Sequence, residues 1–445
     1  MGEPGYRRSP PLFQSMLLDR LQAFTRLEAA GGIVLLVNAV MAFVLANSPW
    51  RDQFLSLWAA PIRFEAGDLH LDTSLRAVID EGLMAIFFLL VGLEIKRELI
   101  EGELRTFRKA LLPAIGAAGG VVLPASIFLA LNHGGPGERG WAIPIATDIA
   151  FSIGCVVLLG KRVPRGLLVF LTALAIFDDI VGIGVIAIFY GHGIRPAGLI
   201  LVAVTAGAVF GIARLGADGA LVYALGGMAM WLAFRWTGLN GTLAGVLLGL
   251  LVPAVSRRPA REVLEELNRR SATALQSDAR VESGELLSLR DSLADGVPPL
   301  QRFEHALHPW VVFGILPLFA LANSGVSLEG LSLRSLGPVF FGIALGLFVG
   351  KQLGVFLFTW GAVKAGFARA PEGSTWGKVH GIATVAGIGF TVSLFIANLA
   401  FGEDPLLLSE ARLGILVGSL ASGVVGTLVL RANSRAPPRI APSAA

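Results

Sequence analysis

Apolar stretches long enough to cross a lipid bilayer recur along this chain from Gly31 to Leu430. One transmembrane helix needs about 20 consecutive apolar residues. The stretches here are long and continuous, whereas the strands of a transmembrane β-barrel are short and alternate in polarity. Charged residues make up only 15% of the chain, against about 25% in a typical soluble protein. The sequence therefore predicts an all-α polytopic membrane protein.

Twelve segments are predicted to cross the membrane. Their approximate bounds are 31–48, 77–95, 110–131, 142–160, 166–190, 197–213, 219–234, 238–253, 309–327, 337–363, 378–401 and 411–430. An even number of spans puts both termini on the same side. The loops on that side hold most of the 36 lysines and arginines, and these residues gather on the cytoplasmic side of membrane proteins. Both termini are therefore expected to be cytoplasmic.

The segments between and around the spans give the predicted domain organisation. The predicted parts are a cytoplasmic amphipathic segment at 1–30, a first membrane part at 31–253, a polar cytoplasmic insertion at 254–303, a second membrane part at 304–431 and a cytoplasmic tail at 432–445. In the first segment, Leu17, Leu21, Phe24 and Leu27 recur at helical spacing, which is typical of a helix lying on the membrane surface. Residues 61–72 alternate in polarity around a Gly-Asp turn and predict an external β-hairpin.

Two features of composition exclude other classes of protein. Cys155 is the only cysteine, so the chain has no internal disulfide and no cysteine metal cluster. The isoelectric point of about 9.5 would suit nucleic acid, but the basic residues fall mostly in the predicted cytoplasmic loops. We therefore expect contact with membrane lipids and no binding of nucleic acid, and we expect no bound cofactor.

Only a few charged residues lie inside the predicted spans. A charge at the centre of a span costs about 3 kcal/mol, and such residues usually serve transport. The candidates are Asp80 and Glu94 in the second span, Asp148 in the fourth, Asp178 and Asp179 in the fifth and Lys351 in the tenth.

Asp178 and Asp179 are adjacent and have apolar residues for a full turn or more on each side. Neighbouring side chains on a helix point about 100° apart, so the two carboxylates do not both face one ion. We expect one to face an ion and the other a fixed cation, and Lys351 is the only cation in mid-span. The alternative is a structural ion pair beside one protonated aspartic acid.

Two predicted spans contain helix-breaking passages. Pro144 precedes Ala-Thr-Asp at 146–148, and glycines interrupt the span at 387–391. Interrupted spans in corresponding places indicate a site at the membrane midplane between inverted repeats. Asp148 would then offset the partial positive charge at half-helix N-termini and Lys351 the negative charge at C-termini. The alternative is that the glycines only allow close helix packing.

Acidic and histidine side chains gather at the predicted cytoplasmic end of two spans. Glu94 ends the second span, and Glu304, His305 and His308 precede the ninth. Such a group at the mouth of a pathway would tune the access of protons. Ordinary contact of long charged side chains with the membrane surface is the alternative explanation.

These residues lie in passages that resemble those of the NhaA-type sodium/proton antiporters. The matching passages are LMAIFFLLVGLEIKREL at 83–99, WAIPIATDIAF at 141–151, the aspartates at 178–179, HPW at 308–310, LPLFALANSGV at 316–326, GK at 350–351 and GIGFT at 387–391. They occur in the expected order over roughly residues 27–431. This family is itself one of the known examples of inverted repeats with interrupted spans. The interrupted spans and the resemblance are therefore not independent evidence for a midplane site.

The resemblance implies twelve spans, two interrupted helices that cross, and electrogenic exchange of Na⁺ or Li⁺ for protons across the bacterial inner membrane. It implies that Asp179 is the main ion ligand and that Asp178 pairs with Lys351, with Thr147 and Asp148 at the crossing. The external hairpin would join two copies in a homodimer.

The resemblance also implies a cytoplasmic funnel that senses pH. The funnel residues would be Asp80, Glu94 and Glu304, together with the position of Asn240. The family often has a histidine at that position, and asparagine does not titrate.

The expected mechanism is competition between ions at the buried carboxylates. Desolvation favours the neutral form of a carboxyl group, so near neutral pH it holds a proton or a Na⁺ but not both. The first alternative function is a sodium-coupled carrier of an organic anion on the same fold. The second is an intramembrane aspartyl protease, but that chemistry needs two carboxylates from different helices, whereas Asp178 and Asp179 are adjacent. We therefore expect no enzymatic activity.

Overall fold

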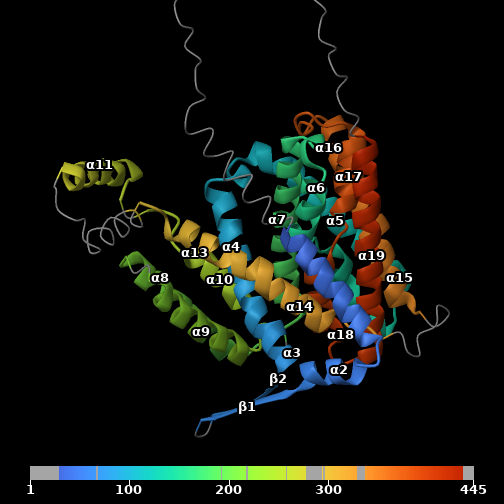
Figure 1. Cartoon of the computed structure of the whole chain (residues 1–445). Helices are drawn as coiled ribbons and strands as arrows, with labels where there is room; N and C mark the ends of the chain where they lie inside the picture. The colour runs from blue at the N-terminus through green and yellow to red at the C-terminus, as the bar shows by residue number, and fades with distance from the viewer. Residues whose placement is uncertain are drawn as a thin grey trace, which may run out of the picture.

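The computed structural model describes residues 30–433 except 67–68, 192, 217–218, 257, 277–292, 294–295 and 328–335. The predicted amphipathic segment at 1–30 lies almost wholly outside these residues, as does the predicted tail at 432–445. The structure describes 31 of the 50 residues of the predicted insertion at 254–303, and these include helix α11, Ala260–Gln276. The described part of the chain is helical apart from one hairpin (Figure 1).

The first half of the chain runs from the helix at Ala30 to α10. Its elements are a helix over Ala30–Ala46, α2 (Arg51–Ala59), β1 (Pro61–Ala66), β2 (Leu69–Ser74), α3 (Leu75–Ala77), a π-helical stretch (Val78–Leu83), α4 (Met84–Ile100), a short 3₁₀ helix (Glu103–Arg105), α5 (Phe107–Asn132), a longer 3₁₀ helix (Pro136–Ile145), α6 (Ile149–Val157), a 3₁₀ turn (Gly160–Arg162), α7 (Arg165–Phe189), α8 (Pro196–Arg214), α9 (Ala220–Thr237) and α10 (Thr242–Leu251). In Figure 1, α8 and α9 lie at the outer edge of the molecule, beyond α10.

The second half follows α11. Its elements are α13 (Pro299–Trp310), a π-helical stretch (Val311–Ile315), α14 (Leu316–Asn323), α15 (Pro338–Leu345), a π-helical stretch (Gly346–Gly350), α16 (Lys351–Lys364), α17 (Trp376–Val385), α18 (Phe390–Phe401) and α19 (Pro405–Ala432). The hairpin lies at one end of the molecule, whereas α11 and the α16–α17 connection lie at the other (Figure 1). We call these the hairpin end and the α11 end.

A β-hairpin lies at the residues where the sequence predicts one. Strands β1 and β2 pair antiparallel, with Pro61 opposite Ser74 and Ala66 opposite Leu69. The strands extend two residues beyond the predicted end at 72, because the ladder continues as far as the first turn of α3. The side chain of Ser74 accepts a hydrogen bond from the backbone N–H of Ala77 and so caps that turn.

The multi-span helical architecture is confirmed. Each of the twelve segments predicted to span the membrane is largely helical in the structure. By length and composition, six described helices could cross a bilayer, and three further pairs of helices bent at a short break raise that number to as many as nine. The three remaining predicted spans fall on α4, on α9 and on the ten-residue α10. The structure therefore establishes a multi-span protein, while twelve remains a prediction.

Close helix contacts fix the position of the central helices. Helix α5 packs along α16, and a Cβ atom placed on Gly354 would lie 2.0 Å from the backbone oxygen of Gly119. Small residues let two backbones approach this closely in membrane proteins. Glycine is therefore required at Gly354, and the contact holds the first turn of α16, which carries Lys351, against α5.

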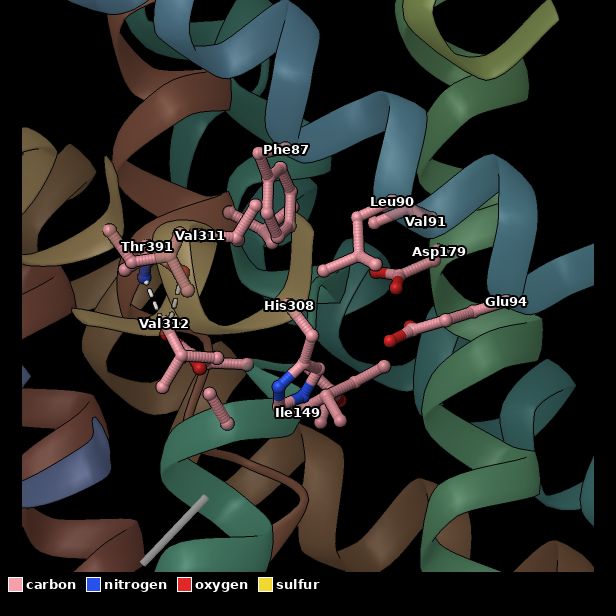
Figure 2. Close-up of a pocket in the computed structure, with 15 residues that line it drawn as sticks. Phe87, Leu90, Val91, Glu94, Ile149, Asp179, His308, Val311, Val312 and Thr391 are labelled. Atoms are coloured by element: carbon pink, nitrogen blue, oxygen red, sulfur yellow. Dashed lines mark hydrogen bonds between the residues drawn. The ribbon is translucent and has the colours of Figure 1, made fainter. Parts of the chain in front are cut away.

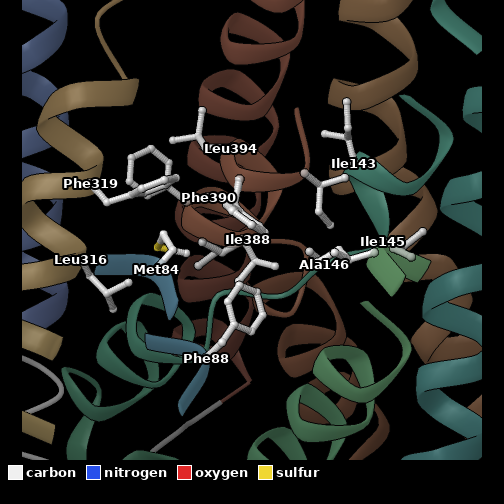
Figure 3. Packing of buried hydrophobic residues seen from close by; sticks show 14 of the residues in the cluster. Met84, Phe88, Ile143, Ile145, Ala146, Leu316, Phe319, Ile388, Phe390 and Leu394 are labelled. Carbon is white, nitrogen blue, oxygen red and sulfur yellow. The ribbon is translucent and has the colours of Figure 1, made fainter. Parts of the chain in front are cut away.

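Apolar side chains surround the middle of the bundle. Figure 3 shows Phe88 from α4 and Phe319 from α14 close to Ile388 and Phe390. Ile388 and Phe319 are completely buried, and Phe88 and Phe390 are 3% exposed. Polar groups inside this shell have little access to water and need partners within the protein.

Candidate functional site

Two spans are broken at the same depth in the bundle. The 3₁₀ helix Pro136–Ile145 and α6 meet at 42°, and α17 and α18 meet at 43°. Pro144 has no backbone N–H to donate, and glycines flank Ile388 in the second break. Both interruptions fall where the sequence predicted them, and each frees backbone groups that must bond elsewhere.

The two breaks hydrogen-bond to each other. The backbone N–H of Asp148 donates to the carbonyl oxygen of Ile388 at 2.6 Å. The hydroxyl of Ser393 donates to the carbonyl oxygen of Ile143 at 2.8 Å, and the hydroxyl of Ser152 to that of Val385 at 3.2 Å. The freed backbone groups of each broken span are thus satisfied by the other, and the two breaks form one crossing.

Asp148 neutralises the N-termini of two half-helices at this crossing. Its Oδ1 accepts from the backbone N–H of Phe151 in α6 at 3.0 Å. Its Oδ2 accepts from the backbone N–H of Thr391 in α18 at 3.0 Å and from the Thr391 hydroxyl at 2.6 Å. Because helix N-termini carry partial positive charge, both oxygens of this buried carboxylate are already compensated.

Asp178 is paired with Lys351. The ammonium of Lys351 lies 2.8 Å from Asp178 Oδ2, and both side chains are completely buried. The ammonium also donates to the carbonyl oxygen of Ile145 at 2.5 Å. Ile145 is the last residue of the 3₁₀ helix that forms the first half of the broken span. The Thr147 hydroxyl lies 2.7 Å from Asp178 Oδ2 and 2.8 Å from the Ala386 oxygen, and its single proton serves one of them at a time.

Asp179 differs from Asp148 and Asp178 in the surroundings of its carboxyl group. Its side chain is 7% exposed, and no hydrogen bond or ion pair joins its carboxyl group to any residue that the structure describes. It faces a cavity of about 40 Å³, which Thr147, Asp148, Glu94, His308 and Thr391 also line. Figure 2 shows Asp179 and Glu94 directed toward this space from α7 and α4. A cavity of this size holds a water molecule or a small cation.

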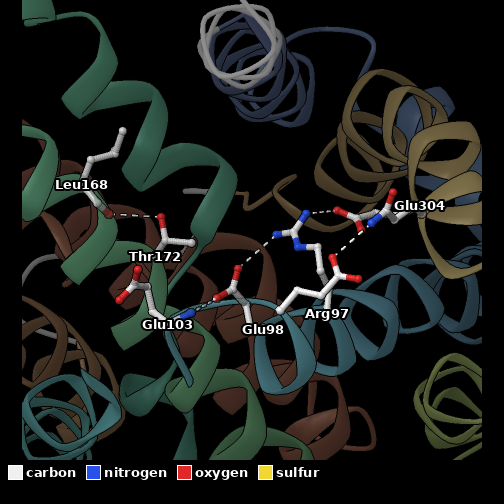
Figure 4. A network of polar contacts seen from close by, with 8 residues as sticks. Arg97, Glu98, Glu103, Leu168, Thr172 and Glu304 are labelled. Carbon is white, nitrogen blue, oxygen red and sulfur yellow. Dashed lines mark hydrogen bonds and ion pairs between the residues drawn. The ribbon is translucent and has the colours of Figure 1, made fainter. Parts of the chain in front are cut away.

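Of the acidic residues predicted at a pathway mouth, Glu304 belongs to an ion-pair cluster at the α11 end. The guanidinium of Arg97 bonds to Glu304 on α13 and lies 3.4 Å from Glu98 (Figure 4). Glu304 is buried, and Glu94 lies one helical turn before Arg97 with its side chain in the cavity. This cluster therefore joins α4 to α13 beside the cavity that Asp179 faces.

Two residues predicted for the same funnel lie elsewhere. Asp80 precedes Glu94 by 14 residues, about 21 Å along a helix, and it hydrogen-bonds near the hairpin end of α14. Asn240 accepts hydrogen bonds from Thr242 at the start of α10, close to the end of α9, where Arg235 pairs with Glu81. The structure thus places Asp80 and Asn240 toward the hairpin end, apart from Glu94, and their predicted role in the funnel stays a prediction.

A second polar cluster surrounds Asp80, and the sequence analysis missed it. The amide groups of Asn323 and Asn398 donate to the Asp80 carboxylate at 2.6 and 3.2 Å. The guanidinium of Arg412 donates to the amide oxygens of the same two asparagines at 3.2 and 2.9 Å. Asparagines in α14 and α18 and an arginine within the apolar part of α19 were the available signal, but their meeting depends on the tertiary fold.

Replacing Arg412 by leucine should destabilise the protein by about 3 kcal/mol. The change leaves the amide oxygen of Asn398 without its donor, takes one donor from the amide oxygen of Asn323 and removes one of the two positive charges near Asp80. Breaking a buried charged network costs about this much. Thermal unfolding in detergent measures the effect. The control is Arg431→Leu, an exposed arginine on the same helix, which should change the free energy of unfolding by less than about 0.5 kcal/mol. Equal stability of the two variants would contradict the network.

Comparison with known proteins adds independent information. The family model described as Na+/H+ antiporter 1 matches residues 22–430. The chain belongs to this family. It is 51% identical over 425 residues to Na(+)/H(+) antiporter NhaA 1 of Myxococcus xanthus, covering 95% of this chain and 94% of the relative. It is 50% identical over 428 residues to Na(+)/H(+) antiporter NhaA of an Anaeromyxobacter species, covering 96% and 93%.

Membership of the Na+/H+ antiporter 1 family confirms the resemblance to the NhaA-type antiporters. A third relative, Na(+)/H(+) antiporter NhaA of Bordetella petrii, is 44% identical over 424 residues, covering 93% of this chain and 91% of the relative. The family consists of ion transporters, so the prediction that the chain is not an enzyme is confirmed. The residues of the crossing all lie inside the matched region.

Proposed function

We propose that this protein exchanges Na⁺ or Li⁺ for protons, with Asp179 as the ligand that binds either ion. The observation that carries this proposal is that the three buried aspartates differ in their partners. Asp148 is compensated by two helix N-termini, and Asp178 by Lys351. Asp179 alone of the three has no such partner among the described residues, and it faces the cavity.

The cavity favours competition between the two ions. A carboxylate in a site of low dielectric binds a proton or a sodium ion strongly, but it does not bind both. The hydroxyls of Thr147 and Thr391 and the carboxylate of Asp148 line the same space and supply further oxygen atoms. Oxygen ligands suit a small hard cation, and this cavity of about 40 Å³ leaves room for few water molecules.

Asp178 and Lys351 provide a second proton and make the exchange electrogenic. When Na⁺ binds near Asp179, its charge disturbs the Asp178–Lys351 pair, and this pair releases a proton. More than one proton then moves for each Na⁺. The net charge that crosses the membrane draws about 2.3 kcal/mol per 100 mV from the membrane potential.

In alternating access, the cavity opens to one side of the membrane at a time, and the two polar clusters near opposite ends of α4 control this opening. The Arg97–Glu304 cluster lies beside the cavity at the α11 end, which the positive-inside rule assigns to the cytoplasm. The Asp80 cluster closes the hairpin end. In the complete arrangement, twelve spans form two inverted repeats in the bacterial inner membrane, with both termini cytoplasmic, and the external hairpin joins two copies.

Proton movement in vesicles tests the proposed exchange directly. Purified protein in liposomes with an internal acid load should alkalinise the lumen when Na⁺ or Li⁺ is added outside, whereas K⁺ should have no effect. The assay is repeated across pH, because the Arg97–Glu304 cluster is proposed to set the active range. Proton movement that needs an added organic anion would instead favour the sodium-coupled carrier.

Replacing Asp178 by asparagine should make the exchange electroneutral or greatly weaken its response to voltage. The variant removes the carboxylate that pairs with Lys351 and keeps Asp179. A valinomycin-imposed potassium potential should then change the exchange rate by less than about a fifth of its effect on the parent protein, since the work done by the field scales with the net charge moved. An unchanged voltage response would remove Asp178 from the proton pathway.

A further inference from the structure

A large cleft opens at the α11 end, away from the crossing. Its volume is about 940 Å³. The N-terminal parts of α5 and α7 form two of its walls, and the connection between α16 and α17 forms the third. Gly166 in α7 lets that connection approach closely, because a Cβ atom there would lie 2.9 Å from the backbone oxygen of Glu372. The α16–α17 connection appears at the top of Figure 1.

The rim of this cleft is basic. Arg108 and Lys109 come from α5, Arg165 from α7 and Arg369 from the α16–α17 connection, and the acidic residues on the rim are Glu103 and Glu372. Lys109 pairs with Glu103 at 3.2 Å. The structure shows no hydrogen bond or ion pair between the other three basic side chains and any described residue. The cleft thus has more positive charge than its own acidic groups neutralise.

Two helix N-termini add to this positive charge. Helix α5 has 26 residues and α7 has 25, and no side chain of the N-cap residues Thr106 and Pro164 caps either helix. The first N–H groups of a helix have no partner within it and carry partial positive charge. Guanidinium groups from three separate segments therefore line one space, beside the N-termini of two helices.

The inner wall of the cleft is apolar. Leu112 from α5 and Val169, Phe170 and Ala173 from α7 line it. Ala173 lies eight residues beyond Arg165, so this wall extends about 12 Å along α7 from the basic rim toward the hydrocarbon region. A soluble anion would contact only the rim, whereas the wall fits a hydrocarbon chain.

We infer that this cleft binds an anionic phospholipid, with the phosphate at the rim of Arg108, Arg165 and Arg369 and an acyl chain along Val169 and Phe170. Basic pockets between transmembrane helices on the cytoplasmic side recognise anionic headgroups. The lipid contacts α5, α7 and the connection that follows α16. Helices α7 and α16 carry Asp178 and Lys351, so the bound lipid holds together the helices that make this ion pair.

Native mass spectrometry of the purified full-length protein in neutral detergent tests the inference. Dioleoylphosphatidylglycerol should bind at least tenfold more tightly than dioleoylphosphatidylcholine, and it should raise the temperature of unfolding. Arg108→Gln should weaken its affinity about fivefold, and Arg108→Gln with Arg369→Gln about 25-fold, because each basic residue near an anionic lipid contributes about this factor. Arg108→Lys with Arg369→Lys should keep most of the affinity and shows that the fold tolerates changes at these sites.

The matched control is Arg431→Gln, which removes an exposed arginine of α19 outside the cleft. Equal phosphatidylglycerol affinity in the double glutamine variant and in this control would overturn the inference. Binding of glycerol phosphate or inorganic phosphate as tight as that of the lipid would also overturn it, because the site would then recognise a soluble anion. Lipid binding is measured without ion exchange, so its failure is distinguishable from failure of the proposed antiport.

Discussion

Replacing Asp179 by asparagine should abolish sodium-dependent proton movement while leaving the protein folded. The variant keeps the size of the side chain but removes the charge that faces the cavity. A unit charge pair at 4 Å is worth about 4 kcal/mol at the effective dielectric typical of protein sites, which corresponds to nearly three factors of ten in affinity. The loss should therefore be close to complete at millimolar Na⁺.

Two measurements on the Asp179→Asn variant separate a lost site from a lost fold. Binding of radioactive Na⁺ to the purified protein should fall together with the proton flux, while the temperature of unfolding should not decrease, since Asp179 has no described partner to lose. Asp404→Asn is the matched control. This aspartate caps α19, and asparagine is an equally good capping residue, so exchange should be normal. Normal exchange by Asp179→Asn would refute the assignment of the site.

Replacing Lys351 by methionine should lower the free energy of unfolding by about 3–5 kcal/mol. Methionine fills a similar volume, but the Asp178 carboxylate is then buried without its cation, and removing one partner of a buried ion pair has this cost. The carbonyl oxygen of Ile145 also loses its donor. The second oxygen of Asp178 already has no hydrogen-bond partner in the described structure, so the site has little capacity to compensate.

The double variant Asp178→Asn, Lys351→Met should recover most of this stability. It removes both charges, and a buried ion pair is often no more stable than neutral groups of similar size. Lys364→Met on the same helix is the control. Lys364 is exposed, and its ammonium lies over the ring of Trp360. The expected loss in the free energy of unfolding is therefore less than about 1 kcal/mol. A Lys351→Met protein as stable as this control would show that the pair does not stabilise the fold.

Several features of this protein could be predicted from its sequence. Long apolar stretches specify helices in lipid, because a helix satisfies its own backbone groups. Pro144 and the glycines around Ile388 indicated the two breaks, since proline removes a donor and glycine weakens a helix. Charges inside apolar stretches are costly enough to be conspicuous, and Asp148, Asp178, Asp179 and Lys351 were found for that reason.

Only the tertiary structure decided which groups meet. The bond from Thr391 to Asp148 joins residues 243 positions apart, and the cluster of Asp80, Asn323, Asn398 and Arg412 joins four separate segments. Helical periodicity gives the face of a residue on its own helix but not the neighbour that this face contacts. The sequence determined that three aspartates are buried, and the crossing of the broken helices decided that two are compensated while Asp179 faces the cavity.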